Sequence, residues 1–312
     1  MPLEPEASHA VRPGQAADGM TRLSVILCFF DMPREARRTL HSLTTTYQLG
    51  VEAPDYEVIA IDNGSTRPLD PGWVESLGPQ FRHVSFDARS PSPCAALNHG
   101  VGAARGELVM CCIDGARILS PGILGQTLLA TRSYPHPFVY SLSMHIGPQC
   151  QNASMMDGYD QTVEDALLAT VDWETNGYRL FEVSSPPANV SGFFSRLRES
   201  NCFTLRRADY LELGGFDERL GSPGGGLANL DLFNRVHADD KYAPVMLLGE
   251  ATFHQFHGGV ASNVPLSAHP FARFVQEYEE VKGRPFEPVY RRPDYFGASH
   301  AAKQHLPQPL LE

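Results

Sequence analysis

One apolar segment constrains the fold of this chain more than any other: residues 107–113 are strongly hydrophobic and lead directly into Asp114-Gly115. A run of this kind is typical of a strand buried on both faces. Such a strand has no structural use for an anion at its tip, because ionised carboxylates are rarely buried unpaired. Ligands of open α/β sheets bind at this end of the strands. Asp114 is therefore predicted to hold a metal ion or the polar part of a ligand. Capping of a helix after Pro121 is the structural alternative.

Length and composition indicate an ordinary globular protein. The 312 residues are 42% hydrophobic, enough for one large or two small domains. A net charge of -11 argues against nucleic acid or an anionic membrane surface as the main partner. No run approaches the roughly 20 apolar residues of a membrane span. Residues 1–21 are rich in Pro, Gly, Ala and acidic residues, which predicts a flexible lead-in and not a signal peptide.

The cysteines carry no recognisable metal or disulfide pattern. Six are present, most of them in apolar strand-like runs, and none forms a CxxC pair: Cys28, Cys94, Cys111, Cys112, Cys150 and Cys202. In such runs a cysteine behaves as a small hydrophobic residue. With no export signal, we expect a cytoplasmic protein.

Hydrophobic periodicity in the first half predicts alternating strands and helices. Strands are predicted over residues 23–30, 56–61, 83–86 and 107–113, and helices after Asp31-Met-Pro33 and over 95–104. Asp31 is expected to be the N-cap of the first helix. This order predicts an α/β fold with a mainly parallel sheet and helices on both faces.

The second half is less regular. Strands are predicted over residues 138–146, 201–205 and 244–248, and helices over 161–173, 207–213, 230–236 and from Phe271 to Gly283. Beyond about Arg291 the chain shows no periodicity, which predicts a loosely held tail.

Polar groups follow three of the predicted strands, at Asp31, Asp62-Asn63 and Asp114. Parallel strands have their carboxyl ends on one edge, so these groups are expected to face a common crevice. Two carboxylates at this edge could bind a nucleotide, one by contacting the base or ribose and the other by holding a metal-bound diphosphate. An Asx turn is the structural alternative for Asp62. Neither GxGxxG nor GxxxxGK[ST] occurs, which disfavours dinucleotide redox chemistry and P-loop phosphoryl transfer.

Several segments, in the same order, resemble the family 2 glycosyltransferases. These segments are Leu23-Ser-Val-Ile-Leu-Cys-Phe-Phe30, Ile61-Asp-Asn-Gly-Ser-Thr66, Asn98-His-Gly100 with Ala104-Arg-Gly106, Ser200-Asn-Cys-Phe-Thr-Leu-Arg-Arg207 and Leu213-Gly-Gly-Phe-Asp-Glu218. The resemblance implies the Rossmann-like GT-A fold in a single domain over residues 22–290. Residues 22–120 would form its nucleotide-binding half and residues 121–290 its acceptor-binding half, followed by a tail at 291–312.

The resemblance also implies roles for residues that bind the donor. Asp62 would contact the base of the nucleotide, with Cys28 and Phe30 lining that pocket. Asn98 would belong to the nucleotide-binding set, and Asn201 would hold the donor sugar. Ordinary turn or strand-edge roles are the alternatives for these residues.

For the metal, Asp114 takes the first position of the family's Asp-x-Asp motif, but Ala116 replaces the second acid. His257, in His-Gly-Gly, is similar to a late family histidine that completes metal binding, and His254 competes for this role. The implied cofactor is Mn²⁺ or Mg²⁺. Exposed loop histidines are the structural alternative.

The segment that carries the general base in the family is where this sequence departs most from the family pattern. Many members have Glu-Asp-x-Asp-Leu before the last core helix, whereas this chain has Ala228-Asn229-Leu-Asp231-Leu. Asn229 cannot accept a proton at neutral pH. Asp231 and Glu199 are the candidate replacements, and a helix-capping role is the alternative for Asp231.

The resemblance predicts an enzyme that transfers a sugar from a nucleotide-diphosphate sugar to an acceptor hydroxyl, with inversion and metal assistance, in polysaccharide or glycoconjugate biosynthesis. The acceptor would be a saccharide or a lipid-linked molecule, which leaves peripheral membrane or homo-oligomeric association open. The alternative is a degenerate nucleotide-sugar-binding or regulatory protein, suggested by Ala116 and Asn229. A nucleotidyltransferase is disfavoured because its basic, glycine-rich phosphate loop is absent.

Overall fold

The computed structural model describes residues 21–87, 91–188, 190–297, 300–307 and 310. The predicted lead-in falls outside this range except for its last residue. Within the described part, no helix is both long and apolar enough to cross a bilayer.

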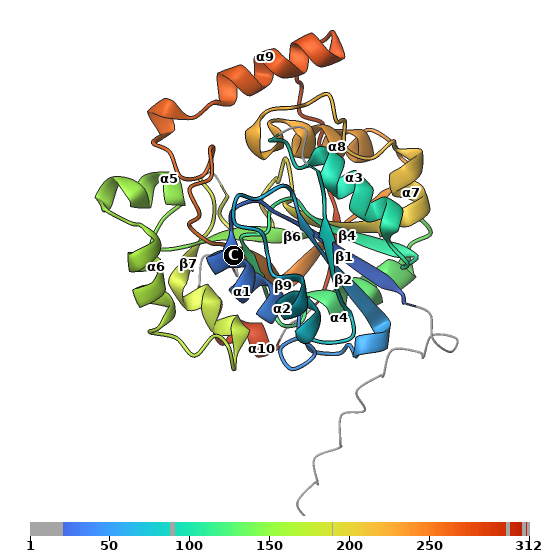
Figure 1. Cartoon of the computed structure of the whole chain (residues 1–312). Coiled ribbons are helices and arrows are strands. Elements are labelled where there is room, and N and C mark those ends of the chain that lie inside the picture. Colours follow the sequence, from blue (N-terminus) through green and yellow to red (C-terminus); the bar gives the residue numbers. More distant parts are fainter. Residues whose placement is uncertain (1–20, 88–90, 189, 298–299, 308–309, 311–312) are drawn as a thin grey trace, which may run out of the picture.

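A single ten-stranded sheet forms the centre of the molecule (Figure 1). Its strands are β1 (Leu23–Phe29), β2 (Tyr56–Asp62), β3 (Phe81–Ser85), β4 (Leu108–Cys112), β5 (Arg117–Leu119), β6 (Pro137–Ile146), β7 (Ser184–Ser185), β8 (Cys202–Arg206), β9 (Ala243–His254) and β10 (Asp294–Phe296). The order is β10-β9-β6-β8-β4-β1-β2-β3, with β5 paired to β9 and β7 to β6. The predicted α/β fold class is confirmed.

Helices pack on both faces of the sheet. They are α1 (Pro33–His41), α2 (Pro71–Ser76), α3 (Cys94–Ala103), α4 (Ile123–Ala130), α5 (Gln151–Ser154), α6 (Gln161–Leu168), α7 (Arg207–Glu212), α8 (Ala228–His237), α9 (Phe271–Lys282) and α10 (His300–Lys303). In Figure 1, α3, α7 and α8 lie above the sheet, α1, α2 and α4 lie below it, and α5 and α6 stand at one end.

Side chains alternate between the two faces of the sheet along each strand, so the hydrophobic core has two parts, one on each face. On β1, Ile26 and Cys28 join the core under α3 and α8, whereas Val25, Leu27 and Phe29 join the core over α1 and α4. Successive side chains point to opposite faces, so a strand buried on both sides must be apolar throughout. This is the physical reason for the continuous apolar runs in the sequence.

The sheet changes direction at β8. Strands β1 to β4 are parallel, but β8 lies antiparallel between β4 and β6, which are parallel to each other. The amino-terminal end of β8 therefore meets the carboxyl end of β4, with Cys202 opposite Cys112. The backbone N–H of Ile113 donates to the carbonyl of Asn201 at 3.1 Å. This reversal brings residues 199–201 beside Asp114.

Two predictions are corrected by these elements. The tail predicted to be loosely held contains β10, which pairs with β9, and α10. Asp31 is not the N-cap of α1, because that position is Met32. Asp31 has a positive φ of 51° and its carboxylate accepts from Thr66 Oγ1 and the backbone N–H of Arg67, so it anchors the loop after β2.

Candidate functional site

Asp114 lies just after β4, at the carboxyl edge predicted for it, and its side chain is 21% exposed. One oxygen, Oδ1, accepts the backbone N–H of Ala116 at 3.1 Å, and Oδ2 is 2.8 Å from Nε of Arg117. Gly115 has no space for a side chain, since a Cβ there would lie 2.2 Å from the ring of Phe29. The turn that presents Asp114 therefore requires glycine.

Two histidines face this carboxylate. Ligand atoms of Asp114, His254 and His257 all lie within 4.8 Å of one another. Nε2 of His254 is 3.1 Å from Nε2 of His257. Two donors bound at about 2.0–2.2 Å to one ion lie roughly 3 to 3.5 Å apart, so this spacing is compatible with a shared metal. Both histidines named as competing ligands thus belong to one cluster.

The tautomer of His254 suits metal binding. Nε2 of Gln151 donates to the carbonyl of His254 at 2.9 Å, which turns Oε1 of the same amide toward Nδ1 of the ring at 2.8 Å. An amide oxygen only accepts, so His254 carries its proton on Nδ1. The Nε2 lone pair is then free to bind a cation, as in metal sites whose histidine is oriented by an outer hydrogen bond.

A second amide holds the turn that carries His257. The carbonyl oxygen of Asn263 accepts the backbone N–H groups of His257, Gly258 and Gly259 at 2.9 to 3.2 Å. Its Nδ2 donates to Oε1 of Gln151 at 2.9 Å. Asn263, Gln151 and His254 therefore form one hydrogen-bonded unit that fixes both histidines.

Arg117 takes a place beside the position where the motif expects a second acid. Ala116 is completely buried, so an acidic side chain there would lack solvent. Arg117 itself is 6% exposed and also donates to Oγ of Ser143 at 2.7 Å. The cluster therefore contains one carboxylate and a buried guanidinium in place of two carboxylates.

Burial keeps the histidines neutral. It lowers the pKa of His254 far below the ordinary value, and the positive charge of Arg117 acts in the same direction. Burial likewise lowers the pKa of His257, although Asp114 opposes this shift. His145, which pairs with His254 between β6 and β9, has a pKa of about 4 for the same reasons of burial and the Arg117 charge. Neutral imidazole is the form that binds metals.

The nucleotide-binding residues predicted near β1 and β2 do meet at the same edge. Cys28 and Phe29 pair with Ile61 and Asp62, and Phe30 is 49% exposed just beyond β1. Burial raises the pKa of the Cys28 thiol, and Cys94 and the charges of Asp114 and Asp62 act in the same direction.

Asp62 has a clear structural role. Its Oδ1 accepts from the N–H of Ser65 at 2.9 Å and its Oδ2 from the N–H of Leu69 at 2.8 Å. The Asx turn considered as the alternative is therefore present. Each carboxylate oxygen has a further lone pair, so contact with a ligand is not excluded by these bonds.

Asn98 is a correction to the predicted nucleotide-binding set. Its Oδ1 accepts from the hydroxyl of Tyr210 and the N–H of Phe216, and its Nδ2 donates to the carbonyl of Phe216 and to Glu218. The whole amide is used to bind α3 to the turn after α7. Asn98 thus has a structural role, which is to join α3 to the turn after α7.

Glu199 and Asn201 lie at the start of β8, near Asp114. Nδ2 of Asn229 donates to Oε2 of Glu199 at 2.9 Å and lies 3.5 Å from Oδ1 of Asn201. Glu199 is solvent-exposed, yet the surrounding protein desolvates its carboxyl and raises the pKa, as does the charge of Asp114. Asn229, in the position where the family has its base, therefore holds a carboxylate supplied by another segment.

Asp231 has different neighbours. It is 1% exposed, and its carboxylate is bound by Arg235 at 2.9 Å, Lys282 at 3.1 Å and the hydroxyl of Tyr278 at 3.3 Å. These contacts join α8 to α9. The structure thus disfavours Asp231 as the general base, because its oxygens are committed to cations and a hydroxyl.

Sequence reasoning missed Arg117, His145, Gln151 and Asn263. Gln151 and Asn263 lie in segments without periodicity, and His145 was assigned only to a strand. The place of His145 in the site follows only from the strand register of the structure, in which it stands directly opposite His254.

Comparisons with known proteins agree with this geometry. Residues 24–147 match the model of the family described as Glycosyl transferase family 2. This part of the chain is therefore similar to family 2 glycosyltransferases, and the predicted resemblance is confirmed over these residues. The match ends before Glu199, His254 and His257. A comparison with curated proteins finds no match.

Among solved structures, S. aureus TarS 1-349 in complex with UDP-GlcNAc has a TM-score of 0.53 at 15% identity, over 86% of this chain and 68% of that chain. S. aureus TarS has a TM-score of 0.52 at 15% identity, over 86% of this chain and 41% of that chain. A further TarS 1-349 structure is matched over only 60% of its length. At this identity the similarity shows the fold, which is the predicted GT-A type.

Proposed function

We propose that this protein transfers a sugar from a nucleotide-diphosphate sugar to an acceptor hydroxyl. The observation that carries the proposal is the cluster of Asp114, His254 and His257 at the carboxyl edge of the sheet, with Asp114 and Asp62 inside the segment that matches the family 2 model. TarS has been solved with UDP-GlcNAc, which makes uridine donors the first to test.

The donor set fits a divalent cation. One carboxylate oxygen and two neutral imidazole nitrogens lie within 4.8 Å of one another, and two imidazoles suit a transition-metal ion better than the oxygen-seeking Mg²⁺. When bound, such an ion neutralises charge on the departing diphosphate. Oδ2 of Asp114 is shared with Arg117, so this guanidinium supplies further positive charge on the same side.

Glu199 is the proposed general base. The acceptor oxygen would bond to the anomeric carbon while the bond from that carbon to the diphosphate breaks, and the hydroxyl proton would pass to Glu199. A raised pKa suits this role, because it brings the carboxylate closer to neutral pH. Asn229 would orient the carboxylate through its 2.9 Å hydrogen bond. Inversion is the outcome that direct attack would give.

Donor binding and hydrolysis test the proposal. Thermal-shift measurements with UDP-, GDP- and dTDP-sugars plus Mn²⁺ should show one stabilising donor, and metal-dependent hydrolysis of that donor should follow. Asp114→Asn should lower turnover at least about 100-fold, because a ligand to the charge-neutralising ion is lost. Asp240→Asn, at a fully exposed carboxylate, is the control.

The outcomes separate an enzyme from a binding protein. A donor that stabilises the protein but is never consumed would support the degenerate, regulatory alternative. Absence of any shift with all three donor classes would contradict both readings. Unchanged turnover in Asp114→Asn would remove the metal site from the proposal.

A further inference from the structure

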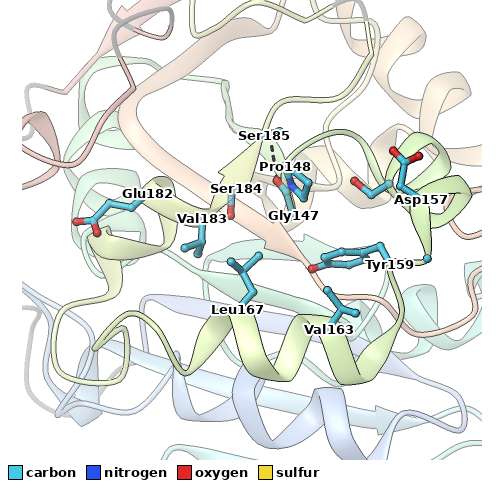
Figure 2. A pocket seen from close by; sticks show the side chains of 12 residues that line it. Gly147, Pro148, Asp157, Tyr159, Val163, Leu167, Glu182, Val183, Ser184 and Ser185 are labelled. Atoms are coloured by element: carbon cyan, nitrogen blue, oxygen red, sulfur yellow. Dashed lines mark hydrogen bonds between the residues drawn. The ribbon is translucent and has the colours of Figure 1, made fainter.

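A pocket of about 620 Å³ lies beside the cluster, between α6 and the segment Glu182–Ser185 (Figure 2). Its volume is within the range of small-molecule sites, about 300–1,000 Å³. None of the residues discussed above as ligands or base lines this pocket.

The walls of the pocket are apolar. Figure 2 shows Val163 and Leu167 rising from α6 toward Val183 and Ser184, with Tyr159 beside them. Val163 is 44% exposed, so its methyl groups are accessible to a ligand. Aliphatic and aromatic side chains arranged in this way suit the ring of a ligand.

The charged residues at the pocket are both acidic. Asp157 and Glu182 lie at opposite ends, and Glu182 turns away to bind Arg179 and His305 (Figure 2). Among the residues that the structure describes, no lysine or arginine lines the pocket. A phosphate group would meet carboxylates with no cation to balance it, so the pocket does not suit the nucleotide donor.

The elements that form the pocket also hold the metal cluster. Gln151, which binds His254, and Ser154, which lines the pocket, belong to the same short helix. Glu164 of α6 accepts the N–H of Phe256 at 2.7 Å, and the Tyr159 and Phe256 rings lie 6.1 Å apart. The pocket is therefore separated from the His254 to His257 turn only by these shared walls.

We infer that this pocket binds an uncharged ring attached to the acceptor sugar. The inference rests on the proposed function, and it specifies the substrate class as a glycoside with an apolar aglycone. Such an acceptor would place its ring against Val163 and Leu167.

Phenyl and methyl β-D-glucopyranoside are the probes. Saturation-transfer NMR of the protein without donor should show that the phenyl glucoside binds and the methyl glucoside binds at least about tenfold more weakly, because the ring has apolar walls to bury against. Phenyl phosphate should bind no better than the methyl glucoside. Val163→Asp should weaken phenyl glucoside binding about tenfold or more, since it introduces a carboxylate at the ring position.

Val289→Asp makes the same substitution at an exposed valine away from the pocket and should leave binding unchanged. In the transfer assay, the preference for phenyl over methyl glucoside should appear in kcat/KM and should disappear in Val163→Asp alone. Donor affinity should be equal in all three proteins.

Equal binding of phenyl glucoside to the wild-type protein and Val163→Asp, or no binding, overturns the inference. Transfer without a phenyl preference also overturns it. Loss of donor binding with intact, Val163-dependent phenyl binding would instead overturn the proposed function and leave the pocket as a ligand site.

Discussion

At the scale of single residues, the most informative contact is between Asp114 and Arg117. A chain with an Asp-x-Asp motif would offer two carboxylates to one ion, but position 116 is buried under the sheet edge. The guanidinium at 2.8 Å fixes the remaining carboxylate instead. A metal bound here would compete with Arg117 for Oδ2, so the two histidines would carry more of the binding.

The amide of Gln151 is expected to matter as much as a ligand. We predict that Gln151→Leu lowers Mn²⁺ affinity about 10- to 100-fold, because His254 loses the acceptor that fixes its tautomer. Titration of free Mn²⁺ by electron paramagnetic resonance measures this affinity. Gln126→Leu, on α4, is the matched control. Wild-type affinity in Gln151→Leu would show that the ring is oriented without the amide.

At the scale of secondary-structure elements, the antiparallel β8 and the docking of α9 determine which carboxylate reaches the site. β8 brings Glu199 to the edge where β4 ends, whereas α8 keeps Asp231 against α9. Two acids that are equally plausible in the sequence therefore have different environments.

This difference predicts opposite phenotypes. Asp231→Asn should lower the free energy of unfolding by about 2 to 4 kcal/mol, because Arg235 and Lys282 lose their buried counter-ion. Glu199→Gln should leave stability nearly unchanged and abolish sugar transfer. Urea unfolding and donor consumption measure the two effects. A stable but inactive Asp231→Asn protein, together with an active Glu199→Gln protein, would reverse the assignment of the base.

Element prediction from the sequence succeeded where periodicity was strong and failed where it was short or interrupted. The apolar runs of β1, β2 and β4 and the stop of α9 at Gly283 were predicted because burial on two faces and a helix-ending glycine leave clear patterns. β5 and β10 have three residues each, too few to show a period.

The strand predicted over residues 244–248 in fact continues to His254. Gly249 and Glu250 interrupt its apolar run, but Gly249 has a positive φ of 80° in an irregular part of the ladder with β6. Glu250 is buried, with Ser120, Gly122 and Tyr178 donating to its carboxylate. Only these tertiary partners make a charged residue acceptable inside a central strand. The strand predicted from the sequence pattern was therefore too short.

At the scale of the whole molecule, several buried histidines make stability depend on pH. His237 stacks on Phe233 at 4.1 Å, and burial, with help from the charge of Arg291, lowers its pKa to about 4. Below its ordinary pKa of 6.5 the unfolded chain binds a proton that the folded chain does not. The free energy of unfolding therefore falls as pH decreases from about 6.5 to about 4.

We expect His237→Asn to be less stable than the wild-type protein at pH 7 because the stacking is lost. Its deficit should shrink toward pH 4.5, by at most about 1.4 kcal/mol per pH unit, because the variant no longer suffers this protonation. Urea unfolding at several pH values measures the slope. His99→Asn, at an exposed histidine, is the control. Parallel pH curves for wild type and His237→Asn would contradict the assignment.

The sequence by itself determined the layered α/β architecture, the carboxylate at the tip of β4 and the family resemblance, since each follows from local patterns of apolar residues and short motifs. Only the tertiary structure decided which side chains meet Asp114. Arg117 binds it from three residues along the chain, whereas the antiparallel β8 brings Glu199 to the same edge. His145 and Gln151 belong to the site through His254, by a cross-strand register and a side-chain amide, and these long-range pairings leave no periodic signal along the chain. The same pairings turned Asp231 and Asn98 from candidate site residues into structural ones, because their hydrogen-bonding groups are already satisfied inside the fold.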